Sequence, residues 1–399
     1  MTQTMNTVDA ILKEIYGPRI ENQLQNECVG PKRIERTSEG VTSTVGGKYV
    51  DFPIKVSRNH GIGYRAENSA LPAAGKQKYA EVHVPLKYGY GRVKYTGQLM
   101  TLARTNVQAF TNAVEQENEG LKDDLVKDSS RIFYGDGSGL IASITSTTSS
   151  SATQSVDNAQ WLEEDMIVDV LVRSSGSSSG GLTNATVVSV DRTPGANTVT
   201  LSSAWTGALT QGIYRQGSYG EEPTGLGKIV DSTSTLHTLD PASQPKWAGV
   251  EVGNGGTLRP LSEGLMIQTC DQVRVNGGKT SAIFTSLGCR RSYFNLLTQQ
   301  RRYTNTKEFA GGFTGLPFNY GTEIPVVEDV DHGPNTMHFL EEKAFKIYRD
   351  KEWHWMDDDG HVLKWVTDYD CWEALMRQYS ELGVSHRNHQ AVLQDIIEA

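Results

Sequence analysis

The sequence contains few cysteines, and none of them forms a paired motif. Its 399 residues include only four, which are separated by long stretches without a C-x-x-C pair. Zinc ribbons and dithiol redox centres need closely spaced cysteines, so the spacing excludes both. We expect buried free thiols at Cys28, Cys270, Cys289 and Cys371.

Long apolar runs are also missing. No stretch reaches the roughly 18 apolar residues that a membrane-spanning helix needs. The first thirty residues lack the basic segment and apolar core of a secretion signal. We therefore expect assembly in the cytoplasm, without secretion or membrane insertion.

Positive charge is in deficit, with 38 Lys and Arg against 47 Asp and Glu, for a formal net charge of -9. Tight binding of nucleic acid needs a positive surface, because counterion release from phosphates supplies much of the affinity. The balance disfavours tight DNA binding. It remains compatible with a container whose wall does not grip the polyanion inside.

Two segments resemble ligand-binding loops but lack the required residues. Residues 276–280 (NGGKT) end like a phosphate-binding loop, yet Val273 stands where the first glycine is needed. Residues 357–360 (DDDG) resemble half of a calcium loop, but Trp355 and Val366 replace the first ligand and the closing glutamate. Both segments are better interpreted as turns.

Catalytic and metal motifs fail in the same way. His386 and His389 have no carboxylate or cysteine in ligand spacing, and no H-E-x-x-H occurs. Ser138 is not a nucleophile elbow, because Asp136 replaces the preceding glycine. We predict no catalytic residue, no metal ligand and no cofactor, and therefore no enzyme.

The amino-terminal half predicts extended rather than compact elements. Residues 7–27 carry the apolar stripe of an amphipathic arm helix, which packs on its own subunit or on a neighbour. Alternating strands around residues 50–56 and 80–86 enclose a polar, glycine-rich loop. A connection of this length indicates a loop with a function of its own, or else a solvated hairpin tip. Charged residues suited to contacts with another chain are Arg58, Arg65, Glu67, Lys76 and Lys78.

Residues 101–134 predict one long helix of about 50 Å at 1.5 Å per residue, since apolar side chains recur every three or four positions without proline. Short β-like runs separated by SSGSSSGG and TPGA follow, and we interpret residues 158–217 as a small inserted β barrel or sandwich.

The remainder predicts an α/β layer with returning strands. Helices are expected within residues 258–276 and 288–303, and strands within 281–287, 324–330 and 337–348. Residues 351–366 predict a hairpin whose tryptophans pack on a sheet face. Residues 370–384 predict a short helix, followed by a strand in 388–396. One basic helix face, for a subunit contact or for solvent, is predicted at Arg290, Arg291, Arg301 and Arg302.

This order of elements, together with local sequence, resembles the major capsid proteins of tailed double-stranded DNA bacteriophages, which have the Hong Kong 97-type fold. The similar segments are residues 63–100 (GYRAENSALPAAGKQKYAEVHVPLKYGYGRVKYTGQLM), 131–139 (RIFYGDGSG), 285–331 and 342–393. The resemblance covers most of the chain outside residues 158–217.

The resemblance implies an α+β capsid fold divided in the way those proteins are. Its parts would be an amino-terminal arm (1–49), an extended two-stranded loop (50–95), a spine helix with the peripheral domain (96–157), the inserted all-β domain (158–217), an axial α/β domain (218–325), and returning strands with a helix (326–399). Some relatives crosslink a loop lysine to a neighbour's asparagine, and Lys76 and Lys78 are candidates by location alone.

The implied function is a structural subunit that assembles into an icosahedral head around phage DNA. The implied partners are further copies in hexamers and pentamers, a separate scaffolding protein because no long fused scaffold precedes the loop, a portal protein, a decoration protein in some heads, and weakly contacted DNA. The implied location is the virion. The alternatives are an encapsulin-like compartment shell and, from another class, a secreted β-rich binding module, which the absent signal and disulfide spacing disfavour.

Overall fold

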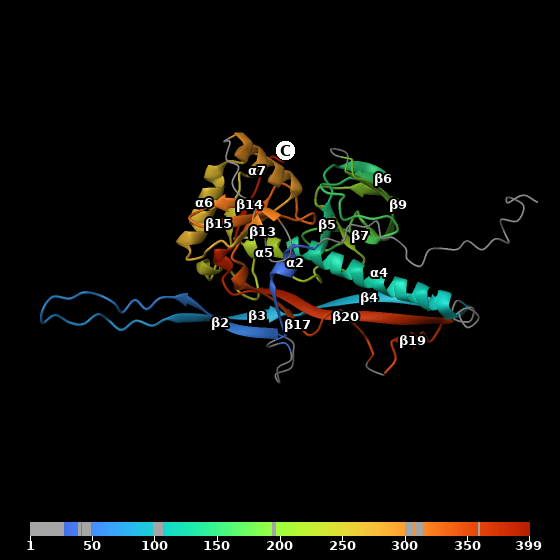
Figure 1. The fold of residues 1–399 in the computed structure, drawn as a ribbon, viewed down its shortest axis with the longest axis horizontal. Helices are drawn as coiled ribbons and strands as arrows, with labels where there is room; N and C mark the ends of the chain where they lie inside the picture. Colours follow the sequence, from blue (N-terminus) through green and yellow to red (C-terminus); the bar gives the residue numbers. More distant parts are fainter. Residues whose placement is uncertain are drawn as a thin grey trace, which may run out of the picture.

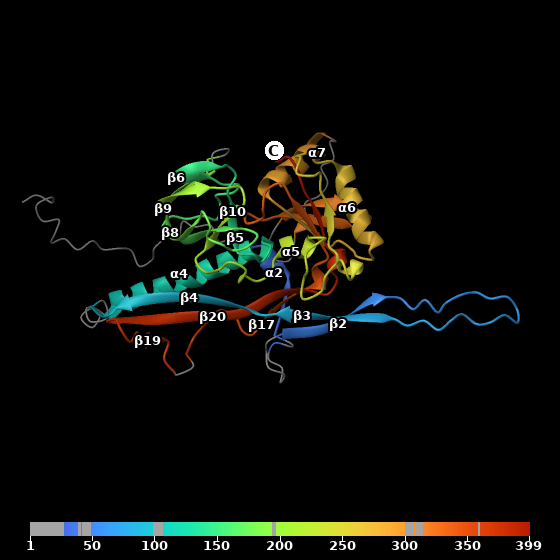
Figure 2. The same ribbon diagram turned by 180° about the vertical axis from the view of Figure 1, so that it is seen from behind.

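The computed structural model describes residues 28–38, 41, 49–98, 107–193, 197–299, 307–308, 314–357 and 360–399. They form a long, flat base with two lobes standing on one side of it (Figure 1). A narrow hairpin prolongs the base at one end, and the view from behind gives the same outline (Figure 2). The predicted arm helix at residues 7–27 lies outside the described residues.

The base is built around β20 (Cys371–Val384), a long strand near the end of the chain. One edge of β20 pairs antiparallel with β4 (Lys87–Thr96). The other edge pairs with three shorter strands placed end to end, which are β17 (Phe345–Arg349), β18 (His354–Trp355) and β19 (Leu363–Trp365). β1 (Glu35–Thr37) then pairs parallel with β17.

This long strand shows that the helix predicted in residues 370–384 was wrong. Glu373, Ala374, Leu375 and Met376 all favour helices in isolation, which misled the prediction. In the protein the segment is paired on both edges, and Ala374 and Met376 point to the same side, where they are 0% and 2% exposed. Burial between neighbouring strands overrides the local preference.

The hairpin predicted in residues 351–366 was also wrong. Its two arms became β18 and β19, and each of them pairs with β20. Residues 358–359 of the expected turn lie outside the described part of the chain. Each arm pairs with the long edge of β20, whereas an isolated two-stranded hairpin is only marginally stable in water.

α4 (Val107–Tyr134) lies along the base sheet and confirms the predicted long helix, of which residues 101–106 fall outside the described residues. On the side of β4 that faces it, Val93 and Tyr95 are buried. An added Cβ at Gly91 would lie 2.6 Å from Leu125 Cδ1. Glycine therefore permits the close approach of helix and sheet.

The lobe that contains most of the predicted axial domain, called the axial lobe below, is a seven-stranded mixed sheet flanked by two helices. α6 (Glu263–Val275) packs against β11 and β21, and α7 (Leu287–Gln299) packs against β15. Both helices and the central strands agree with the predictions. The strand order is β11 (Val250–Val252), β21 (Ala391–Leu393), β16 (Met337–Leu340), β12 (Ala282–Thr285), β15 (Glu323–Glu328), β14 (Thr314–Asn319) and β13 (Lys307–Glu308).

The second lobe is an all-β unit with its own hydrophobic core. Its antiparallel strands run in the order β5 (Leu140–Ser143), β10 (Gln211–Arg215), β7 (Ile167–Val172), β8 (Leu182–Asp191), β9 (Thr198–Gly207) and β6 (Thr148–Ser155).

The sheet therefore begins before residue 158, the predicted start of the insertion. β5 and β6 come from the Ser/Thr-rich residues 138–156, which precede the predicted insertion. Their hydroxyl-bearing residues pair across strands, as Thr153 does with Thr200 through a 2.8 Å hydrogen bond between the side-chain oxygens.

β2 (Tyr49–Ser57) and β3 (Lys78–Pro85) form the predicted hairpin at the end of the base. Short helices complete the fold, namely α2 (Gly30–Arg33), α5 (Leu226–Val230), and the 3-10 turns η1 (Pro245–Trp247), η2 (Glu342–Ala344) and η3 (Arg387–His389).

Candidate subunit-contact surfaces

The extended loop, residues 58–77 between β2 and β3, projects far beyond the rest of the molecule (Figures 1 and 2). Val82 and Val84 of β3 anchor its base, since both are 0% exposed in the largest hydrophobic core. Beyond the base, two glycines bring the arms of the loop together. A Cβ on Gly61 would lie 2.6 Å from the backbone nitrogen of Gly75. The loop is thus a narrow ribbon on a rigid mount.

The five charged residues predicted from the sequence are all exposed on this hairpin. Arg58, Lys76 and Lys78 lie near its base, whereas Arg65 and Glu67 lie near its tip, so the structure gathers them on one element but in two groups. None of the five forms an ion pair with another described residue. They are free to contact another chain.

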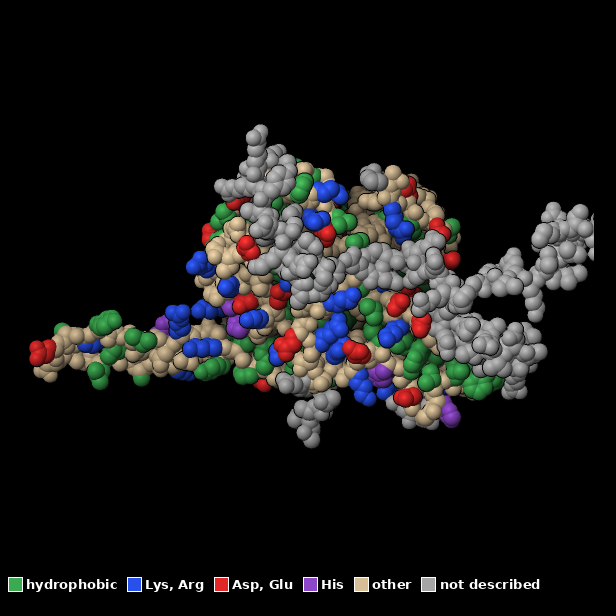
Figure 3. Space-filling view, in the orientation of Figure 1, with side chains coloured by type: hydrophobic (Ala, Val, Ile, Leu, Met, Phe, Trp, Pro, Cys, Tyr) green, Lys and Arg blue, Asp and Glu red, His purple; other side chains and the backbone are tan. Residues whose placement is uncertain are grey.

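The sequence prediction missed the apolar residues of the same loop. Ile62, Tyr64 and Leu71 are 83%, 102% and 86% exposed. Figure 3 shows hydrophobic side chains along the projecting hairpin, with basic side chains closer to its base. An apolar cluster of this kind on a projection marks a contact surface. The signal was available, because three large apolar residues stand in an otherwise polar, glycine-rich loop.

A second exposed surface lies on the side of the base sheet that faces away from α4. Tyr88 and Tyr90 of β4 are 56% and 62% exposed, and their rings meet Tyr379 of β20 edge to face, with centroids 4.9 Å and 6.4 Å apart. The Arg377 guanidinium lies 5.9 Å from the Tyr379 ring centroid. Tyrosine and arginine are enriched in protein interfaces.

The predicted packing of the tryptophans holds in part. Trp353 and Trp355 are half-buried, and Trp353 covers Gly89 of β4. Trp365 meets Trp372 edge to face at 5.5 Å but is 52% exposed. One edge of the base sheet therefore also presents an aromatic ring to solvent.

A buried carboxylate joins the base to the axial lobe. Asp329 Oδ2 accepts hydrogen bonds from the backbone nitrogens of Val29 and Gly30, at 3.3 Å and 3.0 Å, and from the Tyr134 hydroxyl at 2.8 Å. Burial and the Asp329 carboxylate raise the pKa of Tyr134 well above its usual value. Residues 29–30, the end of α4 and the sheet of the axial lobe are thus held at one point.

Two histidines lie beside this point. His332 Nε2 and His338 Nδ1 are 2.7 Å apart, and both residues are buried. Burial lowers the pKa of His332 to about 4 and that of His338 well below its usual value. Both rings are therefore neutral near pH 7, as a tightly packed junction requires.

Ion pairs fix the all-β lobe to α4. Arg131 contacts Asp128 at 2.9 Å and Glu222 at 2.5 Å, and Arg215 also reaches Asp128, at 3.2 Å. Burial alone would raise the pKa of Asp128, but Arg131 and Arg215 lower it below its usual value. These pairs orient the lobe relative to the base.

The predicted basic face on α7 is partly used within the subunit. Arg290 pairs with Glu328, and Arg291 Nε donates to the backbone oxygen of Ala399 at 2.5 Å. Arg301 and Arg302 lie outside the described residues. The interpretation of this face as a separate binding surface is therefore weakened.

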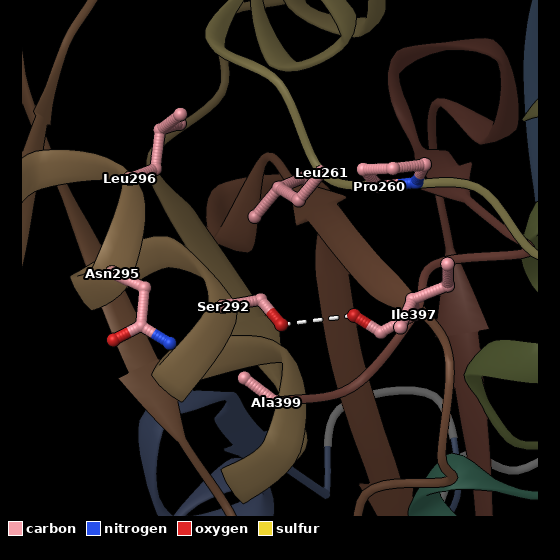
Figure 4. A pocket seen from close by; sticks show the side chains of 7 residues that line it. All are labelled: Pro260, Leu261, Ser292, Asn295, Leu296, Ile397 and Ala399. Atoms are coloured by element: carbon pink, nitrogen blue, oxygen red, sulfur yellow. Dashed lines mark hydrogen bonds between the residues drawn. The ribbon is translucent and has the colours of Figure 1, made fainter. Parts of the chain in front are cut away.

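A pocket of about 260 Å³ lies beside the same helix. Figure 4 shows it between α7 and the end of the chain, where Ser292 Oγ donates to the backbone oxygen of Ile397 at 2.9 Å. It is smaller than the roughly 300–1,000 Å³ of ordinary small-molecule sites. Its lining residues are Pro260, Leu261, Ser292, Asn295, Leu296, Ile397 and Ala399.

The prediction of buried thiols is confirmed for three cysteines and that of a turn for the NGGKT segment. Cys28, Cys270 and Cys289 are buried and form no disulfide, whereas Cys371 is only half-buried. Residues 276–280 form the turn after α6, in which Gly277 adopts a φ of 95°.

Comparison with known proteins identifies the fold. No family model matches the chain, and no curated protein matches it. Among solved structures, the capsid asymmetric unit of cyanophage A-1(L) superposes with a TM-score of 0.61 at 15% identity, covering 99% of each chain. The chain has the Hong Kong 97-type capsid fold.

Two further structures support this capsid fold. The capsid of a native GTA particle has a TM-score of 0.51 at 10% identity and covers 100% of both chains. A chain of Mycobacterium phage Bobi has a TM-score of 0.50 at 7% identity and covers 99% of both. The fold predicted from element order and local sequence is confirmed, and the two exposed surfaces described above lie on a chain with this capsid fold.

Proposed function

We propose that this chain is the major capsid protein of a tailed bacteriophage, a structural subunit that builds the icosahedral head around double-stranded DNA. The observation that carries the proposal is the extended loop. It is rigidly mounted, exposes Ile62, Tyr64 and Leu71, and has charged residues that form no ion pair with the part of the chain that the structure describes. In an assembled shell, neighbouring copies of the chain would cover these residues.

The proposed mechanism is repeated association rather than catalysis. Each copy offers its loop to a neighbour, and closed symmetry repeats that contact around the shell. Modest pairwise affinities then combine, because a copy held at several contacts dissociates far more slowly than one held at a single contact. Apolar loop residues provide affinity, while Arg58, Arg65, Glu67, Lys76 and Lys78 provide register.

The proposal includes the partners that accompany this function. Copies would form hexamers and pentamers, assisted by a scaffolding protein and closed by a portal protein, with a decoration protein as an additional candidate. Packaged DNA would contact the wall weakly, in keeping with the net charge of -9. The location would be the virion after assembly in the host cytoplasm. No described helix is long and apolar enough to cross a membrane.

Electron microscopy of purified protein tests the proposal. The full chain is expressed alone and together with a candidate scaffolding protein, and the products are separated by sedimentation. We expect closed icosahedral particles in at least one of the two preparations. A chain that stays monomeric in both would contradict the proposal.

The same particles separate this function from the encapsulin-like alternative. A phage head protein gives shells that accept DNA through a portal, whereas a compartment shell encloses a cargo enzyme. Particles that carry a bound enzyme would favour the compartment.

A further inference from the structure

Three side chains with metal-binding groups meet on the outward face of the β2–β3 hairpin. Asp51 and His83 are directly opposite each other in the ladder, and Glu81 lies two residues before His83 on the same face of β3. The opposite face carries Val82 and Val84 into the core. The backbone that presents the three groups is therefore firmly held.

The ligand atoms of the three are close enough to share one ion. One carboxylate oxygen from Asp51, one from Glu81 and a ring nitrogen of His83 all lie within 4.8 Å of one another. His83 Nδ1 is 2.6 Å from Asp51 Oδ1, and the side chains of Asp51 and His83 are 45% and 38% exposed. Small rotations of such side chains reach the ligand bonds of about 2.0–2.2 Å that zinc makes.

The chemical types of the three ligand groups favour one class of metal ion. Two carboxylates and an imidazole suit first-row transition metals, whereas magnesium and calcium prefer oxygen ligands alone. Two neighbouring carboxylates also repel each other, and a divalent cation relieves that repulsion. In the described part of the chain, no other group of three His, Cys, Asp or Glu residues meets the same distance criterion.

We propose that Asp51, Glu81 and His83 bind one divalent transition-metal ion such as Zn²⁺. The ion would connect β2 to β3 at the base of the extended loop. Three protein ligands leave a fourth tetrahedral position for water or for a group from another chain. Binding is a property of the dispersed subunit, so the test does not depend on shell formation.

Titration calorimetry of the untagged, metal-free full chain with Zn²⁺ tests the site. We expect one ion per chain, and at least about 10-fold weaker binding for His83→Ala, since loss of even a supporting group costs that much. His361→Ala, which removes another exposed histidine, is the matched control and binds like the wild type. Binding that is equal in His83→Ala and wild type, or absent from both, would overturn the proposal.

Cobalt provides a second readout that does not depend on stability. Co²⁺ added to the wild type should give a visible absorption band, and Asp51→Asn and Glu81→Gln should each weaken it. Circular dichroism in EDTA shows whether the variants are folded. If His83 and Asp51 form only an ion pair, His83→Ala should melt at a different temperature from the wild type in EDTA, and added metal should not shift the melting temperature of the wild type. That result would also overturn the proposal.

Discussion

The extended loop and the base beneath α4 differ in where their contacts lie. In the base, β20 is paired along both edges, and Ala374 and Met376 are 0% and 2% exposed. In the loop, Tyr64 is 102% exposed. Within one subunit the side of the base that faces α4 is buried, whereas the apolar side chains of the loop stay exposed. The base therefore stabilises the subunit, while the loop is available to stabilise an assembly.

Removal of the loop should have the largest effect on assembly and little effect on the stability of the subunit. Residues 59–76 are replaced by Asn-Gly, which keeps the β2–β3 ladder and closes it with a favoured hairpin turn. The melting temperature should change by no more than about 2 °C, because few folded contacts are lost. Particle formation, measured by sedimentation and electron microscopy, should disappear. If the variant formed particles like those of the wild type, the loop would not be needed for assembly.

Arg387→Met should have the largest effect on the subunit itself. Arg387 is 0% exposed and donates to the backbone oxygens of Lys228, Ile229, Asp231 and Ser234. Methionine leaves these acceptors without their donor, at a cost of about 1–3 kcal/mol for each one that stays buried and unsatisfied. Urea unfolding should show a much lower midpoint. An unchanged midpoint would show that water replaces the guanidinium easily.

Tyr64→Ser combined with Leu71→Ser should affect assembly and leave folding unchanged. Burial of two such side chains at a contact contributes about 3 kcal/mol, so the threshold concentration for particles should rise about 100-fold. Light scattering against concentration measures it. Arg65→Gln is the matched control on the same loop, and a change of only a few-fold is expected because exposed charges contribute little.

Glu381→Gln should have a smaller effect that depends on pH. Burial raises the pKa of Glu381 to about 7, and its Oε1 accepts from the Thr224 backbone nitrogen at 2.7 Å. A raised folded pKa means that stability is full below the unfolded value of about 4.5 and falls as pH rises through 7.

Glutamine keeps the acceptor for Thr224 and carries no charge. Its melting temperature should exceed that of the wild type at pH 8, by the equivalent of about 3 kcal/mol, and should match it at pH 4.5. An equal gain at both values would show that ionisation of Glu381 is not the cause.

The sequence predicted the parts of the fold whose patterns are local. The apolar stripe of α4, the alternation in β2 and β3, and the buried run of β12 depend on neighbouring residues, and each was recognised. β20 was taken for a helix because its partners, β4 and the β17–β19 series, come from distant parts of the chain. β5 and β6 were missed because serine and threonine are also common in turns.

The candidate surfaces were likewise predictable only where the signal lies in the local sequence. The charged residues of the loop were predicted, since a long polar connection is visible in the sequence. The exposed Tyr64 was overlooked, although it stands out in a polar loop. The cluster of Tyr88, Tyr90 and Tyr379 was not predictable, because it depends on which face of the base sheet stays uncovered. The meeting of Asp51 with His83 depends on strand register, which the turn and pairing set together.

Hydrogen exchange of dispersed subunits and assembled particles tests the central claim most directly. We expect fast exchange of loop amides 58–77 in the dispersed subunit and at least about 10-fold slower exchange in particles. Amides of β20 should be protected in both. Loop exchange that is equally fast in both forms would contradict the claim that the loop is completed by a second copy.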